Sequence, residues 1–462
     1  MRSAATLTEP MYPSERISSS RHHSRCRDNR RRALAITLVV ALSGALSGAL
    51  GCAARGSSTA ATGSIASTAQ PARPYLVVVS LDAFRHDYLD RYHPQALEQL
   101  AAEGIRASAL VPPFPSKTFP SHYTIATGLY PGHHGIVGNN FYDSQRDRWF
   151  RVKDATTLRD GSWYGGEPIW ITAEREGVKS AVYFWPGSEA EVHGARPSYY
   201  KTFLGSVPDS ERVDASIAWL RLPSAQRPHL VMMYLNSGDD TTHRYGPESP
   251  HTALAVAVLN RAVQRLRDGI ASLPQRDSVN LVVLSDHGMA DAPQEKIIAV
   301  LPLLAAEGVD TSRVRTGDIG PSMALWFGGD DALRDRALLA LSKRLPNAHV
   351  YARGATPARW HLDGNPRAGD LIVVGKLGYV IAARPTDRWL DRGSHGWDPA
   401  YDEMHGIFIA AGPQVRRAGK IPAFDNVNVF PFLAALLGLE HPPRTDADAR
   451  VLASFIRATP TD

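Results

Sequence analysis

Three short segments of the chain carry aspartate and histidine in patterns that suit a metal site. They are Asp239–His243, which reads Asp-Asp-Thr-Thr-His, Ser285–Gly288, which reads Ser-Asp-His-Gly, and Gly393–Gly396, which reads Gly-Ser-His-Gly. A fourth acid, Asp82, follows the apolar run Tyr75–Leu81. Carboxylate oxygen and neutral imidazole nitrogen are ligands that zinc prefers in catalytic sites. Because two such ions can stabilise the attacking and the leaving oxygen of a displacement at phosphorus, the pattern predicts two-metal chemistry of that kind.

Apolar runs alternate with helical patterns along the chain. Strands are expected at 75–81, 180–184, 230–235, 281–284 and 406–410, and helices at 94–103, 169–176, 213–220 and 252–273. Strands separated by helices indicate an α/β fold with a mostly parallel sheet and helices on both of its faces. Ligands bind at the carboxyl ends of strands in such sheets, and Asp82, Asp239 and Asp286 each stand just after an expected strand. One such acid could be a helix N-cap, but three together favour a site.

The segment from about residue 290 to about residue 390 differs from its surroundings. Its apolar runs Met323–Phe327, His349–Ala352 and Leu371–Ala382 are separated by many turns. We expect a smaller inserted α+β subdomain here. It would lie within a metal-dependent domain that spans residues 73–445 and is followed by a C-terminal tail at 446–462.

The N-terminal part of the chain has the pattern of an export signal, which we place at residues 1–52. The basic cluster Arg30–Arg32 precedes the apolar stretch Ala33–Leu50, and the sequence Leu-Gly-Cys ends at Cys52. This end resembles a bacterial lipoprotein signal, so we expect an exported, periplasmic or cell-envelope protein with a lipid anchor on Cys52. An uncleaved membrane helix is the alternative, since the stretch is about long enough to span a bilayer. Residues 53–72, rich in Ala, Ser, Thr and Gly, are expected to form a flexible tether.

Charge and cysteine content exclude two other kinds of site. The segment 1–52 holds eight arginines against three acids, a net charge of +5, and the whole chain is also +5. Everything after Cys52 is therefore neutral overall, and no specific binding of duplex nucleic acid is expected. Both cysteines, Cys26 and Cys52, lie in the leader, so the mature domain has neither an internal disulfide nor a thiolate metal ligand.

Thr118 stands in a proline-rich stretch, residues 111–128, at a position where a helix is expected to begin. Its hydroxyl would face the positive end of the helix dipole, and a nearby metal ion would favour the alkoxide, which is a nucleophile. Threonine at a helix start is more often a simple cap, so its position alone leaves both roles open.

Eight motifs occur together with these residues. They are Ser80–Arg85, Lys117–Pro120, Thr127–Pro131, His134–Asn139, Phe184–Ser188, Asp239 with His243–Pro247, Ser285–Met289 and His395–Asp398. In the order and spacing of these motifs the chain, from about Tyr75 to about Leu439, resembles the nucleotide pyrophosphatase/phosphodiesterase family of the alkaline phosphatase superfamily. The resemblance implies an alkaline-phosphatase-like α/β fold, a nucleotide or another small phosphodiester as substrate, and hydrolysis of its phosphodiester or pyrophosphate bond.

The resemblance also implies a role for each matching residue. One zinc ion would be held by Asp82, Thr118, Asp286 and His287, and a second zinc ion by Asp239, His243 and His395. Thr118 would attack phosphorus and form a phospho-threonine intermediate, while Asn139 donates a hydrogen bond to the developing charge. Phe119 and Tyr234 match positions that flank a nucleotide base, although both could equally be core aromatic residues.

Several conspicuous residues stay outside the ligand set. The histidines expected to be structural, or to support the ligands from behind, are His86, His122, His133, His134 and His405. Asp398 is expected to orient His395, and Arg85 to brace the loop around Asp82. Ser121 and the segment Asn236–Gly238 depart from the family pattern, which would alter the choice of substrate but removes no metal ligand.

The choice of substrate has an alternative within the same family. A choline-phosphodiester or phospholipid-headgroup hydrolase would carry a cage for a quaternary ammonium in place of walls sized for a base. A sulfatase is disfavoured because its nucleophile is usually a modified Cys or Ser, whereas this chain has Thr118. A non-enzymatic surface lipoprotein is disfavoured because none of the expected ligands is missing.

Overall fold

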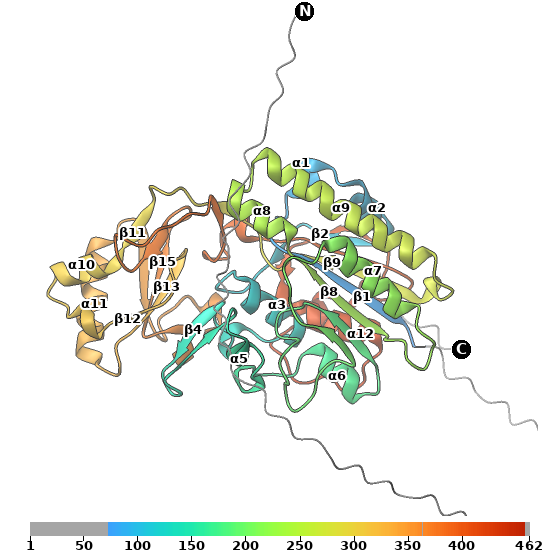
Figure 1. The fold of residues 1–462 in the computed structure, drawn as a ribbon, viewed down its shortest axis with the longest axis horizontal. Helices are drawn as coiled ribbons and strands as arrows, with labels where there is room; N and C mark the ends of the chain where they lie inside the picture. The colour runs from blue at the N-terminus through green and yellow to red at the C-terminus, as the bar shows by residue number, and fades with distance from the viewer. Residues whose placement is uncertain (1–72, 363, 458–462) are drawn as a thin grey trace, which may run out of the picture. The chain divides into compact units, whose positions relative to one another are not determined.

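The computed structural model describes residues 73–362 and 364–457 (Figure 1). The expected signal peptide at 1–52, the lipid anchor at Cys52 and the tether at 53–72 lie outside the described residues and stay predictions. Within the described ranges, no helix is both long enough and apolar enough to cross a membrane.

The largest sheet has eight strands in the order β19-β2-β18-β9-β1-β8-β6-β7. These strands are β19 (Gly419–Ile421), β2 (Ile105–Ala107), β18 (Phe408–Ala411), β9 (Val279–Leu284), β1 (Tyr75–Leu81), β8 (Leu230–Leu235), β6 (Ser180–Tyr183) and β7 (Tyr199–Lys201). β1 pairs in parallel with β8 and β9, and β6 pairs in parallel with β7 and β8, whereas β18 is antiparallel to β9 and β2. All five strands expected from the apolar runs belong to this sheet, so the expected α/β fold with a mostly parallel sheet is confirmed.

Helices cover both faces of the largest sheet (Figure 1). One face packs against α2 (Gln95–Glu103), α7 (Asp209–Leu220) and α9 (Pro250–Ala271), and the other against α3 (Thr118–Thr127), α6 (Ile169–Arg175) and α12 (Val429–Leu437). Side chains of β1 alternate between the two apolar clusters, with Leu76 and Val78 in one and Val77 and Val79 in the other. Because both faces of β1 are buried, its sequence is apolar at every position except Ser80.

The segment expected as an inserted subdomain forms a second sheet. Its four antiparallel strands lie in the order β12 (Arg315–Thr316), β13 (Ser322–Trp326), β15 (Leu371–Gly375) and β14 (Ala348–Ala352). The helices α10 (Val300–Ala306) and α11 (Asp331–Arg344) share an apolar cluster with this sheet, and β11 (Ile297–Ala299) pairs with β16 (Val380–Ala382). The cluster contains Leu304, Leu341 and Val373, so this segment has an apolar core of its own.

The other helices and strands are short. They are α1 (Tyr88–Tyr92), β3 (Leu110–Val111), α4 (Pro131–His134), β4 (Asn140–Asp143), β5 (Arg148–Arg151), α5 (Ala155–Leu158), α8 (Ser237–Tyr245), β10 (Ala290–Asp291), β17 (Gly393–Ser394), β20 (Phe424–Asp425) and α13 (Arg450–Ala453). Residues 446–457, part of the segment expected to form a tail, contact the domain. Leu452 is buried, and the Asp446 carboxylate accepts a hydrogen bond from the backbone N–H of Tyr130 at 2.8 Å.

Arg367 links the second sheet to the loops around α4. Its Nε donates to Oδ2 of the buried Asp143 at 2.9 Å. Its Nη1 donates to the carbonyl oxygens of Gly135 at 3.0 Å and Trp163 at 2.8 Å. A guanidinium that satisfies one buried carboxylate and two carbonyls together is a strong structural contact.

Replacing Arg367 by alanine is expected to lower the free energy of unfolding by about 3 kcal/mol, because buried Asp143 loses its closest charge partner. Thermal and denaturant unfolding of the purified protein measure this change. Arg334→Ala is the matched control, since Arg334 pairs with exposed Asp331 and such surface pairs contribute about 0–1 kcal/mol. Equal stability of the two variants would contradict the role of Arg367.

Candidate active site

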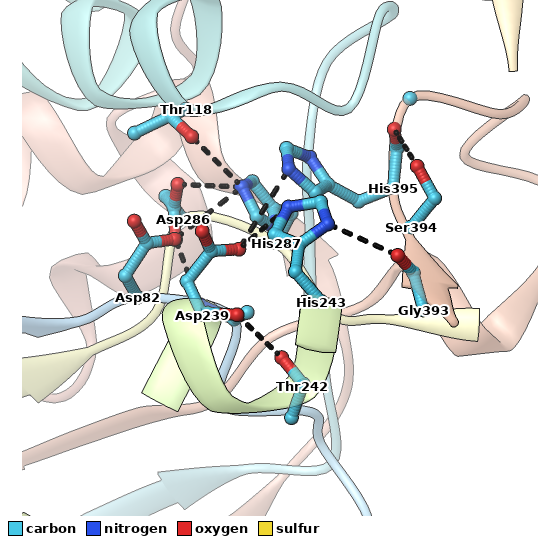
Figure 2. Close-up of polar contacts among 12 residues, drawn as sticks. Asp82, Thr118, Asp239, Thr242, His243, Asp286, His287, Gly393, Ser394 and His395 are labelled. Atoms are coloured by element: carbon cyan, nitrogen blue, oxygen red, sulfur yellow. Dashed lines mark hydrogen bonds and ion pairs between the residues drawn. The ribbon is translucent and has the colours of Figure 1, made fainter. Parts of the chain in front are cut away.

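Two groups of aspartate and histidine lie at the carboxyl edge of the largest sheet (Figure 2). The first group is Asp82, Asp286 and His287, and the second group is Asp239, His243 and His395. Residues of the first group lie just beyond the ends of β1 and β9. The second group combines two residues of α8, which follows β8, with one that follows β17. In each group, one ligand atom from every residue lies within 4.8 Å of the others. The groups adjoin, because the rings of His287 and His395 stack with centroids 3.6 Å apart.

A backbone carbonyl orients each of the three histidines. Nδ1 of His243 donates to Gly393 at 3.0 Å, that of His287 to Gly288 at 2.9 Å, and that of His395 to Ser116 at 2.9 Å. A donating Nδ1 leaves Nε2 as the ring nitrogen that faces the other ligands. This is the arrangement typical of metal-bound histidine, in which the outer hydrogen bond sets both tautomer and ring orientation.

The carboxylates of the site are buried without enough donors. Oδ1 of Asp82, Oδ1 of Asp239 and Oδ2 of Asp286 have no hydrogen-bond partner among the residues that the structure describes. Burial and the negative charges of Asp286 and Asp239 raise the pKa of Asp82 well above its usual value. A buried carboxylate oxygen without a hydrogen-bond donor is costly, and a bound cation would relieve that cost; oxygen with imidazole nitrogen is a donor set for zinc. The residues present therefore fit a pair of divalent metal ions.

Electrostatic effects within the site differ between neighbouring residues. Burial opposes ionisation of Asp286, but the adjacent His287 and His122 outweigh it and hold the pKa of that carboxyl well below its usual range. Burial also raises the pKa of Asp239, but the neighbouring His243 outweighs burial and lowers the pKa of Asp239 to about 2. Burial, helped by His287, lowers the pKa of His395 well below its usual value, so this ring is neutral and able to coordinate a metal.

Thr118 is the first residue of α3, and its hydroxyl oxygen lies 3.3 Å from Nε2 of His287 in the first group (Figure 2). His122, one turn further along α3, supports this contact. Its Nδ1 lies 2.8 Å from the Thr118 carbonyl oxygen and 3.2 Å from Oδ2 of Asp286. Its Nε2 lies 2.8 Å from the hydroxyl of Ser80 in β1. These contacts of His122 therefore hold the N-terminus of α3 next to the first group.

Asn139 lies beside Thr118 with its amide held in one orientation. Its Oδ1 accepts a hydrogen bond from the backbone N–H of Phe119 at 3.0 Å. The Nδ2 group is then left to donate to a ligand in the cavity that Asn139 and Thr118 both line. A donor beside a nucleophile is suited to stabilise negative charge that develops on the group under attack.

A cavity of ≈ 490 Å³ opens beside Thr118. Its aromatic walls are Phe119, Phe184, Trp185, Phe203 and Tyr234. Asp239 of the second group also lines it. The sequence analysis did not identify Phe203, which lies in the loop between β7 and α7. Its side chain is 45% exposed, and its ring packs edge-on against Phe184 with ring centroids 5.2 Å apart. In the sequence, Phe203 is only an aromatic residue in a loop. A role beside the site could not be predicted from that, because only the fold brings this loop to the cavity.

Tyr234 takes part in both the cavity and the candidate metal site. Its ring lines the cavity, as expected for a residue beside a substrate, and it is also largely buried. Its hydroxyl donates a hydrogen bond to Oδ2 of Asp82, a contact that the sequence did not suggest. Asp82 therefore has one oxygen held by Tyr234 and one oxygen without a hydrogen-bond partner in the described chain.

Asp398 does not orient His395 as expected. Its carboxylate accepts hydrogen bonds from Nε1 of Trp360 at 3.2 Å and from the backbone N–H of Ala400 at 2.9 Å, and Ser116 holds His395 instead. The turn that follows His395 directs Asp398 toward the η4 segment Ala358–Trp360, which the sequence order does not reveal.

Arg85 braces the site through the loop after β9. Its Nη1 donates to the carbonyl oxygen of Met289 at 3.3 Å, while Nε and Nη2 bond to Asp87 and Glu248. Of the other histidines expected to be structural, His134 lies 3.0 Å from the Thr124 hydroxyl. His405 lies 2.8 Å from the Pro399 carbonyl oxygen.

Comparison with known proteins gives a consistent result. Residues 76–398 match the family model described as type I phosphodiesterase / nucleotide pyrophosphatase. An uncharacterised pyrophosphatase/phosphodiesterase of Schizosaccharomyces pombe is 34% identical over 383 residues, which cover 80% of this chain and 78% of that protein. Human ectonucleotide pyrophosphatase/phosphodiesterase family member 1 is 34% identical over 381 residues, 80% of this chain but 40% of the human protein. The chain thus spans less than half the length of this mammalian relative.

Solved structures show the same similarity. Murine ectonucleotide pyrophosphatase / phosphodiesterase 5, an inactive variant in complex with AMP, superposes with a TM-score of 0.77 at 28% identity. The match covers 83% of this chain and 100% of the murine one. The human protein of the same name matches with the same TM-score and coverage.

Tyr234→Phe is expected to weaken zinc binding by the first group about 10- to 100-fold, because Asp82 loses the hydroxyl that orients it. Competition with a chromophoric chelator, together with metal content after dialysis, measures the affinity. Phe203→Leu is the control, since Phe203 lines the same cavity without a contact to either group in the described chain. Unchanged zinc affinity in Tyr234→Phe would show that this hydroxyl does not support the metal.

Proposed function

Because this chain belongs to the type I phosphodiesterase / nucleotide pyrophosphatase family, we propose that it hydrolyses phosphodiester or pyrophosphate bonds of nucleotides with two zinc ions and a phospho-threonine intermediate. Asp82, Asp286, His287 and Thr118 would hold one ion, and Asp239, His243 and His395 the other. When bound, the ions would favour the Thr118 alkoxide and neutralise negative charge on the phosphoryl oxygens.

One arrangement carries the proposal. The Thr118 hydroxyl lies at the start of α3, 3.3 Å from a histidine of the first group, and it opens into a cavity that Asp239 of the second group also lines. A phosphoryl group that enters this cavity would meet a nucleophile, both Asp/His groups and the Asn139 amide together. The positive end of the α3 dipole adds to the attraction for an anionic group.

The proposed chemistry has two displacements at phosphorus. In the first, the Thr118 oxygen bonds to phosphorus while the bond to the leaving alcohol or phosphate breaks, which produces a phospho-threonine ester. Asn139 Nδ2 donates to a phosphoryl oxygen as its charge increases. In the second, water bonds to phosphorus, the bond to Thr118 breaks, and the hydroxyl is regenerated with release of the nucleoside monophosphate.

The walls of the cavity support a nucleotide as substrate. Phe119 and Phe203 offer flat apolar rings, and a ring stacked on a base contributes about 1–3 kcal/mol. Lys153 at the exposed edge favours an anionic over a cationic ligand. The carboxylate of Glu189 is already bonded to Arg159 and to the backbone N–H of Phe203, which leaves it poorly placed to bind a quaternary ammonium. The structure of the murine relative with AMP is consistent with this choice.

Thr118→Ala is expected to reduce diester hydrolysis by a factor of about a thousand or more, because the covalent route needs the hydroxyl. Steady-state rates with p-nitrophenyl thymidine phosphate measure the loss, with zinc content determined on the same sample. Thr118→Ser keeps a hydroxyl and is the matched control, expected to retain part of the rate. Near-normal turnover by zinc-loaded Thr118→Ala would refute the mechanism.

The aromatic walls of the cavity predict a preference for nucleotide substrates. The nucleotide diester should exceed p-nitrophenylphosphorylcholine in kcat/KM about tenfold to a hundredfold, which corresponds to stacking of one base. p-Nitrophenyl phosphate in the same panel tests monoesterase activity. Equal or faster hydrolysis of the choline ester would favour the choline-phosphodiester or phospholipid-headgroup alternative.

A further inference from the structure

Arg212 is a charged residue whose side chain is almost completely buried. It lies in the first turn of α7, and its side chain is 1% exposed. A buried guanidinium is costly unless an opposite charge and hydrogen bonds compensate for the lost water. Oδ1 of Asp209, which lies 3.8 Å from Nη1 of Arg212, supplies the opposite charge. The hydrogen bonds of Arg212 come from other parts of the chain.

The donors of Arg212 bond to two backbone carbonyl groups close to the substrate cavity. Nε and Nη2 donate to the carbonyl oxygen of Val207 at 3.1 Å and 2.9 Å, and Nη1 donates to that of Tyr234 at 2.9 Å. The guanidinium carbon also lies 4.9 Å from the ring centroid of Phe184, which is a cation–π contact. Within the described chain Arg212 does not itself line the cavity, so it can affect a ligand there only through these neighbours.

The loop between β7 and α7, which carries Phe203, depends on a few hydrogen bonds for its position. Residues 201–206 are exposed, so packing contributes little to the placement of the Phe203 ring. The backbone N–H of Phe203 donates to Oε1 of Glu189 at 2.7 Å, and the carbonyl of Val207 accepts the two bonds from Arg212. Arg212 therefore holds the end of the loop that leads into α7.

We propose that Arg212 is a positioning residue that fixes the aromatic walls of the substrate cavity and so sets the preference for a nucleotide base, an inference that rests on the proposed function. Arg212 joins three wall segments: the residue after β6, the loop before α7, and β8. A planar guanidinium can bond to two carbonyls in fixed directions, which the single ammonium of lysine cannot. Aromatic contacts depend on the separation and tilt of the rings, so a shift of one wall weakens the stacking of a base.

A comparison of two diesters tests the role of Arg212. Arg212→Met keeps an apolar stem but loses the bonds to Val207 and Tyr234. In zinc-loaded protein it is expected to raise KM for p-nitrophenyl thymidine phosphate about tenfold with little change in kcat, because the base loses part of its stacking. Methyl p-nitrophenyl phosphate has no base, so its kcat/KM should stay as in wild type. Equal losses with the two diesters, as a general structural defect would produce, or no loss with either, would overturn the proposal.

Two further variants separate this effect from an effect on folding. Arg212→Lys keeps a positive charge beside Asp209 and should show the same selective rise in KM, smaller in size; it provides the test if Arg212→Met does not fold. Arg265→Ala is the matched control, since Arg265 of α9 pairs with Asp214 of α7 at an exposed position and should behave as wild type with both diesters. A wild-type KM for both diesters in Arg212→Lys, or the same selective rise in Arg265→Ala, would contradict the role of Arg212.

Equilibrium binding of AMP provides a readout that does not depend on turnover. Calorimetric titration of the zinc-loaded Arg212 variants should give a higher Kd for AMP than wild type, by about tenfold in Arg212→Met, whereas the Kd of inorganic phosphate should stay unchanged. An unchanged Kd for AMP, or an equal rise for both ligands, would overturn the positioning role. A wild-type protein that binds AMP but hydrolyses neither diester would refute the proposed function, and selectively weaker AMP binding by the Arg212 variants would still support the positioning role.

Discussion

The placement of three carboxylates in one buried region is the constraint on which the site depends. Asp82, Asp239 and Asp286 lie together at the carboxyl edge of the largest sheet, and each has an oxygen without a hydrogen-bond partner in the described chain. Like charges in a region of low dielectric repel strongly, so this arrangement is favourable when cations share it. Metal ions bound at the two groups, as proposed, would therefore stabilise the folded chain, because metal affinity and folding are coupled.

Backbone carbonyls orient the three histidines of the two groups. The ring of His395 is bonded to Ser116 in the loop before Thr118, and the Ser116 hydroxyl bonds to the carbonyl of Trp397 and the N–H of Gly396. One loop therefore leads into Thr118 and orients His395 of the second group. A movement of this loop would therefore displace Thr118 and His395 together.

The second sheet adds rigidity to the same region from outside. Arg367 satisfies Asp143 and two carbonyls, while Asp318 reaches Asn140 at the start of the same hairpin. Both ends of β4 are therefore bonded to the segment that carries the second sheet, Asn140 to Asp318 and Asp143 to Arg367. The segment with the second sheet therefore contacts the strand that directly follows Asn139, although it contributes no residue to either Asp/His group.

The strands that precede the two Asp/His groups could be predicted from the sequence. β1 is buried on both faces, and its mainly apolar run places Asp82 at the carboxyl edge by local pattern alone. The spacing on α8 likewise separates Asp239 from its neighbour, because residues four apart share one face of a helix. Only the tertiary structure decided that Tyr234 reaches Asp82, that Phe203 lines the cavity, and that Ser116 takes the role expected of Asp398. These contacts join segments that are distant in sequence, and how such segments meet is set by packing between elements, which no local propensity encodes.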